Sequence, residues 1–150
     1  MNTNEPNNYY QPPQNPYGFV PPPPGKNLIF VSGILLVIFG GIGVLLTALS
    51  LIGGISLGLD GAIVLMIFYE FIVTVLTIVF GVMGIINAKK REKAQSIMNM
   101  GIALCAMKIV DLIAAAMIVD VTMSTVVGVI IGLILPFLFI IGGNMNKQGM

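Results

Sequence analysis

The chain has 150 residues, of which 57% are hydrophobic and only 9% are charged, and its formal net charge is +1. This composition is far outside the range of soluble domains and excludes a water-exposed globular fold. The small net charge gives no long-range attraction for a polyanion, which argues against a role in nucleic-acid binding.

Residues 1–25 form a polar N-terminal tail that holds eight of the nine prolines and three of the four tyrosines, with much of the remainder Asn and Gln. Such a segment has too few apolar side chains to build a core, so we predict that this tail is disordered. Pro21–Pro24 favours a polyproline II helix, and the spacing of Pro13 and Pro16 suits an aromatic-lined groove on another protein. The tail is therefore either a solvated tether or a segment that binds a protein partner.

Four apolar runs follow the tail, over residues 28–51, 62–87, 97–119 and 124–143. Each can cross a hydrocarbon core of ~30 Å, which takes about 20 helical residues. Because the linkers between them are short, sequential helices should be antiparallel neighbours. The sequence thus predicts an all-α polytopic membrane protein, with an up-down bundle of four transmembrane helices in residues 26–146.

Most of the basic residues flank the helix ends that share one face of this bundle. They are Lys26, the cluster at 89–93 and Lys147, whereas the opposite face shows only Asp60 and Asp120. The positive-inside rule then predicts a multi-pass protein of the plasma membrane with both termini in the cytoplasm and the lipid bilayer as its first partner.

Small residues recur at helical spacing in the apolar runs and predict close contacts between helices, as in the Gly128-x-x-x-Gly132 pattern of the fourth run. These contacts lie either inside one bundle or between the copies of a homo-oligomer. The candidate packing residues are Gly33, Gly40, Gly81, Gly84, Gly128 and Gly132.

Three ionisable residues, Glu70, Lys108 and Asp111, lie well inside the predicted spans. Each would cost ~2.5 to 3.5 kcal/mol at the centre of a membrane helix, so they must compensate one another. Antiparallel pairing of the second and third helices places Glu70 and Asp111 at equal depth, and Lys108 is the i−3 neighbour of Asp111. We therefore expect a cluster with the lysine between two acids, in which one acid holds a proton near neutral pH.

The same face of the second helix carries Thr74 and Thr77, which with Glu70 draw a polar stripe that must face protein or water. Histidine is absent and Cys105 is the single cysteine, which excludes catalytic triads with histidine and zinc sites of the Cys/His type. We therefore expect no enzymatic activity, no metal and no cofactor.

Two functions remain open at this stage. The leading interpretation is an association or scaffold protein of the cell envelope, in which the charge cluster only fixes the helix register. The alternative is a small proton- or cation-coupled transporter or channel subunit that uses the charge cluster as its ion site, with the two threonines lining the approach.

The tail, the apolar spans and the segment GVMGIINAKKREKAQSIMNMGIAL together resemble small uncharacterised bacterial membrane proteins of the domain-of-unknown-function type. The resemblance implies a bacterial inner membrane and assigns no functional residue. The four-span size is also similar to that of small multidrug resistance transporters. Those proteins place their key glutamate in the first helix, where this chain has no acid.

Overall fold

A computed structural model of the chain describes residues 21–118 and 123–148, with only the backbone of residues 124 and 125. Most of the N-terminal tail, Asp120 and the side chain of Ser124 lie outside the described residues. Within them, the chain forms four long helices, each long and apolar enough to cross a membrane, and no strand, so the predicted fold class is confirmed. The elements are α1 (Lys26–Ser56), α2 (Gly61–Asn87), the short 3₁₀ helix η1 (Arg91–Lys93), α3 (Ala94–Ile118) and α4 (Met123–Gln148).

Most of the helices extend beyond the apolar runs that predicted them. Helix α1 continues to Ser56 and α4 continues to Gln148, five residues past each predicted end. Hydropathy marks the part of a helix that lies in hydrocarbon, whereas the backbone hydrogen bonds of the helix continue into the polar interface. The apolar runs therefore locate the spans better than the helix ends.

The turn between α1 and α2 is closed by local hydrogen bonds. Leu57 ends α1 by donating its N–H to the carbonyl of Gly53, and Gly58 takes a positive φ of 65°, which glycine adopts without strain. The N–H of Ala62 donates to Asp60 Oδ1 at 2.8 Å, so Asp60 caps the N-terminus of α2. The two helices therefore form a tight antiparallel hairpin.

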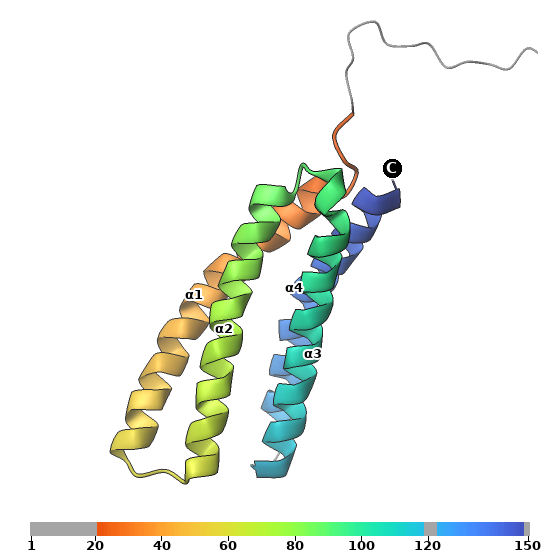
Figure 1. The fold of residues 1–150 in the computed structure, drawn as a ribbon. Helices are drawn as coiled ribbons and strands as arrows, with labels where there is room; N and C mark the ends of the chain where they lie inside the picture. The colour runs from red at the N-terminus through yellow and green to blue at the C-terminus, as the bar shows by residue number, and fades with distance from the viewer. Residues whose placement is uncertain (1–20, 119–122, 149–150) are drawn as a thin grey trace, which may run out of the picture.

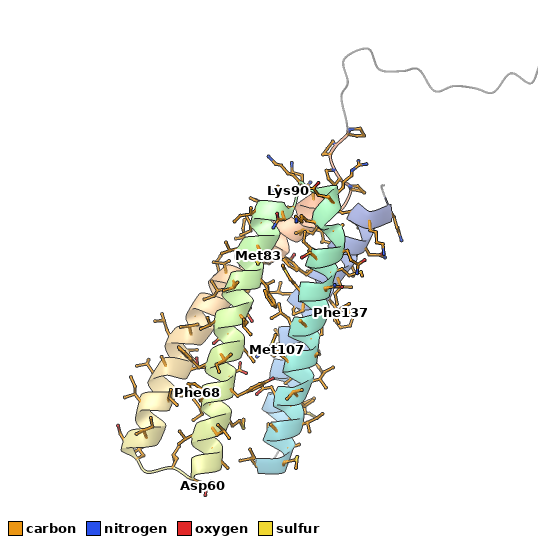
Figure 2. All side chains as sticks on the ribbon, viewed as in Figure 1. Asp60, Phe68, Met83, Lys90, Met107 and Phe137 are labelled. Carbon is orange, nitrogen blue, oxygen red and sulfur yellow. The ribbon has the colours of Figure 1, made fainter. Side chains whose placement is uncertain are left out.

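The molecule consists of two helical hairpins, α1–α2 and α3–α4, which converge at one end (Figure 1). We call this end the basic end, because it carries Lys26, the loop at 89–93 and Lys147. Lys90 lies at the basic end and Asp60 at the opposite end, here called the far end (Figure 2). Large apolar side chains such as Leu45, Leu65 and Ile131 are more than half exposed along the bundle, as expected for contact with lipid.

The buried core lies in the half of the bundle next to the basic end. Its central side chain is Phe139 of α4, which is fully buried and lies against Gly84 of α2 so closely that a Cβ at Gly84 would overlap the ring. Gly33 of α1 and Gly81 of α2 meet with similar closeness, since a Cβ on Gly81 would lie 2.9 Å from the Gly33 carbonyl oxygen. The buried core side chains are Ile29, Leu36, Ala88, Ile97, Leu104 and Phe139.

A fully buried asparagine joins three segments at the basic end. Asn146 Oδ1 accepts a hydrogen bond of 2.7 Å from the N–H of Gly25, and Asn146 Nδ2 donates to the carbonyl of Ala88 at 3.2 Å. The contact links the start of α1, the end of α2 and the last turns of α4. Because the polar groups of Asn146 are satisfied inside protein, the residue fixes the arrangement of the helices at this end.

Candidate functional site

An ion pair joins the two hairpins inside the membrane span. Lys108 Nζ of α3 donates to Glu70 Oε1 of α2 at 2.6 Å, and it is the one ion pair found in residues 21–118 and 123–148. The two side chains are 21% and 24% exposed, so both charges are largely removed from solvent. A short charge-assisted hydrogen bond of this kind is the expected compensation for two charges placed in a bilayer.

Asp111 lies near this pair but does not share the lysine. Its carboxyl group is close enough to interact with that of Glu70, yet no ion pair with Lys108 is formed within 4.0 Å in the described structure. Among the described residues Lys108 therefore pairs with Glu70 alone, whereas we had expected it to lie between the two acids. Lys108 and Asp111 lie one turn apart on the same helix, and the lysine side chain extends across to α2 instead.

Two carboxylate oxygens of this cluster are left without a hydrogen-bond donor. Glu70 Oε2 and Asp111 Oδ1 are both buried, and neither has a partner among the described residues. Buried acceptors of this kind are unfavourable unless a proton, a water molecule or a cation satisfies them. The two acids thus form a place where a small positively charged species would be stabilised.

Tyr69 adds a second link between the hairpins at the same level. Its hydroxyl group donates to the carbonyl of Met107 at 3.0 Å, across α2 and α3. Met107 lies where these two helices face each other (Figure 2). The sequence gives no signal for this contact, because the partner is a backbone carbonyl on another helix. Its neighbour Glu70 makes the corresponding bond to Lys108, so consecutive residues of α2 connect to consecutive residues of α3.

The Glu70–Lys108 pair opens onto a cavity of about 420 Å³ that is lined by all four helices. Its walls are mainly apolar, and the pair and two threonines supply the polar side chains. A largely apolar cavity with a few convergent polar groups is typical of a ligand or ion site. Four glycines also line the cavity: Gly40, Gly43, Gly128 and Gly132.

Thr74 and Thr77 both line the cavity, next to Glu70 on α2. Their hydroxyl groups donate to carbonyls of the same helix, Thr74 to Phe71 at 2.8 Å and Thr77 to Val73 at 2.8 Å. Each hydroxyl oxygen keeps acceptor capacity while it makes these bonds. The polar stripe of the sequence therefore contributes acceptors to the cavity wall.

The small residues proposed as packing positions divide into two groups. Gly33, Gly40, Gly81 and Gly84 lie in close interhelical contact, whereas a Cβ at Gly128 or Gly132 would meet no atom of the described residues within 4 Å. The second pair instead lines the cavity. Within one chain, the Gly128-x-x-x-Gly132 pattern therefore leaves space rather than making a helix contact.

Pro136 adds a polar group near the same wall. Proline has no N–H, so the carbonyl of Gly132, four residues earlier in α4, lacks its usual helical donor. Pro136 is itself buried, where its carbonyl oxygen would lie 3.0 Å from a Cβ on Gly101 of α3. Helix α4 thus packs tightly on α3 at Pro136, and the carbonyl that loses its usual helical donor belongs to Gly132, a residue that lines the cavity.

Comparison with known proteins gives no relative from which a role for these residues can be taken: no protein-family model, curated protein or solved structure matches the chain. The resemblance to small bacterial membrane proteins stays a prediction. The function must therefore be argued from the cavity and the charges that line it.

Proposed function

We propose that this multi-pass membrane protein is a small proton- or cation-coupled transporter or channel subunit. The observation that carries the proposal is the opening of the intramembrane Glu70–Lys108 pair onto a cavity that all four helices share. A pair that serves only to fix the helix register needs no adjoining cavity, whereas an ion site needs a route by which water or an ion reaches it.

Charge balance indicates how the cluster would handle a proton. Two carboxylates and one ammonium carry one net negative charge, which one bound proton cancels. With Lys108 on Glu70, the unpartnered oxygens of Glu70 and Asp111 are the acceptors available to that proton. When it moves fully to Glu70, Lys108 loses its anionic partner and can turn to Asp111, one helical turn away.

This exchange would couple proton movement to the contact between the hairpins. The Glu70–Lys108 bond is one of two side-chain links that join α2 to α3 at this depth, the other being Tyr69 to Met107. Release of Lys108 would weaken the link, and its return would restore it. A small cation at the two unpartnered oxygens would act on the same equilibrium by attracting the carboxylates and repelling the lysine.

The test is proton flux into liposomes that hold the purified chain and an internal pH-sensitive dye. Wild-type vesicles should acidify under an imposed pH gradient, and Glu70→Gln and Asp111→Asn should remove most of that flux. Asp60→Asn is the matched control, because Asp60 caps α2 at the far end and asparagine caps a helix equally well. Tight wild-type vesicles under both a pH gradient and an imposed K⁺, Na⁺ or Cl⁻ gradient would reject the proposal.

A scaffold function is the second candidate, and the basic end supports it. Arg91 donates to the carbonyl of Pro21 at 2.9 Å, and Gly25 is bonded to Asn146, so the segment that leaves the bundle toward the N-terminus is fixed to it. A partner that binds the Pro-rich tail would therefore be held close to the membrane surface. Crosslinking of the full chain in native membranes should then give a specific product that Pro13→Ala/Pro16→Ala removes.

We further propose that the basic end faces the cytoplasm of a bacterial cell, since six of the seven Lys and Arg residues lie there. A C-terminal reporter that is active only in the cytoplasm should be active when fused after Met150. Activity of a periplasmic reporter at that position would reverse the orientation.

A further inference from the structure

A second cavity lies at the basic end, apart from the cavity that contains the charge pair. It has a volume of about 510 Å³ and lies between the first turns of α1 and the last turns of α2. Lys26 and Lys89 line it together with Asn27, Phe30 and Ile86. Nothing in the proposed ion site uses these residues.

The two lysines of this cavity have no anionic partner among the described residues, in which Lys108–Glu70 is the one ion pair. Neither ammonium group makes a hydrogen bond there. The only acid of the adjacent loop, Glu92, is outnumbered by Lys89, Lys90, Arg91 and Lys93. Two unpaired cations that line one concave surface favour a bound anion.

The apolar part of the cavity lies about one helical turn from the lysines. Phe30 follows Lys26 by four residues on α1, and Ile86 precedes Lys89 by three residues at the end of α2. Their side chains are 43% and 63% exposed, so they are available to a ligand. Lys26 begins α1 and Lys89 follows α2, so the charges lie at the level of the polar interface while the apolar side chains lie toward the hydrocarbon.

We propose that this cavity is a binding site for one anionic phospholipid. The phosphate lies between Lys26 and Lys89, the Asn27 amide donates to a phosphate or glycerol oxygen, and the acyl chains follow Phe30 and Ile86. Basic pockets between helices at the membrane surface suit this class of ligand, and the cavity volume is in the range of known ligand sites. The bound lipid would join α1 to α2 at the end where the helices converge.

The test is native mass spectrometry of the full chain in a neutral detergent, with phosphatidylglycerol or phosphatidylcholine of identical acyl chains. Phosphatidylglycerol should bind with clear preference. The double variant Lys26→Gln/Lys89→Gln should weaken it by about twenty-fivefold, taking about fivefold for each lysine. The control Lys90→Gln/Lys93→Gln makes the same change in net charge on exposed lysines outside the cavity and should change the affinity by less than about threefold.

Four results would overturn the proposal. Equal binding of the two lipids would remove the role of headgroup charge, and equal loss in both double variants would reduce the effect to general attraction by the basic loop. Displacement of the lipid by glycerol 3-phosphate at similar concentration would indicate a site for soluble phosphate. Thermal unfolding of both double variants, followed by circular dichroism, should match wild type, because none of the four lysines is buried and none forms an ion pair among the described residues. A lower melting temperature in the cavity variant with lipid binding intact would also contradict the assignment.

Discussion

Removal of Lys108 gives a stringent test of the charge pair. In Lys108→Met the side chain keeps a similar length but loses its charge, so Glu70 Oε1 loses its 2.6 Å partner while Glu70 Oε2 already has none among the described residues. At this distance and an effective dielectric constant of 20, the lost Coulomb attraction is about 6 kcal/mol before desolvation is counted. The variant therefore leaves the Glu70 carboxylate without a cationic partner inside the membrane span.

The net loss is smaller, because desolvation of both ions opposes the attraction. Breaking a buried pair on one side costs about 3 to 5 kcal/mol, and side-chain exposures of 21% and 24% place this pair near the lower end, at about 3 kcal/mol. In Glu70→Gln/Lys108→Met neither member of the pair is left charged without the other, so the free energy of unfolding should return to within about 1 kcal/mol of wild type. The coupling between the two positions should be about 2 kcal/mol or more.

The assay is equilibrium unfolding in mixed SDS and dodecyl maltoside micelles, followed by circular dichroism. The informative control is Lys108→Met/Asp111→Asn, because Asp111 forms no ion pair with Lys108 and its neutralisation should restore less stability than that of Glu70. A Glu70→Gln/Lys108→Met variant that is no more stable than Lys108→Met would refute the reasoning. So would equal rescue by both acids, since that would place the lysine between them.

The remaining predictions separate packing, access and charge. Asn146→Ala should lower the free energy of unfolding by about 2 to 4 kcal/mol in the same micelle titration, because it leaves the buried N–H of Gly25 without an acceptor and creates a void. The control Asn144→Ala, on the exposed side of the same helix, should change it by less than about 0.5 kcal/mol. Gly84→Ala should lower the free energy of unfolding by about 1 to 3 kcal/mol, because the added Cβ overlaps the Phe139 ring. Gly41→Ala, where a Cβ meets no atom of the described residues within 4 Å, should leave it unchanged, and equal losses in the two variants would contradict the observed packing. Gly132→Leu should have the melting temperature of wild type but should block proton flux, because the leucine side chain fills the cavity. Loss of oligomers on native gels with unchanged proton flux would instead place Gly132 at a contact between copies of the chain. Asp111→Asn should leave the melting temperature near that of wild type while it removes proton flux, and unchanged flux would take Asp111 out of the site.

The fold was predictable because its signal is spread over many residues. Four apolar runs of about 20 residues or more and short polar linkers leave few alternatives to a four-helix membrane bundle. The pairing of Glu70 with Lys108 was predictable because opposite charges inside hydrocarbon are stabilised only when they pair. Antiparallel packing of α2 and α3 also places the two residues at similar depth. Depth alone does not fix rotation about the helix axis, so the sequence did not show that Lys108 pairs with Glu70 alone among the described residues.

The packing contacts of individual residues could not be predicted from the sequence. Gly84 and Gly132 look alike in the sequence, yet one lies against Phe139 and the other lines a cavity. The difference depends on how far apart the hairpins lie at each level, which no local pattern encodes. Asn146 was missed for the same reason, because its two partners are 121 and 58 residues away. A polar residue just beyond the last apolar run has no feature in the sequence that separates it from exposed Asn144.

The position of the charge pair along the bundle connects the packing to the proposed function. On α2 the buried residues Val73 and Thr74 lie just toward the basic end from Glu70, and on α3 Leu104 lies one turn from Lys108 on the same side. The pair and the cavity therefore lie next to the closely packed half of the bundle, and the cavity reaches toward it along Thr74 and Thr77 of α2. Near the basic end, glycine contacts and Asn146 hold the helices in fixed positions. A change in the pairing of Lys108 would leave that half in place and act on the spacing of α2 and α3 beyond it. An ion site at this level could thus move the far halves of the hairpins without unpacking the core.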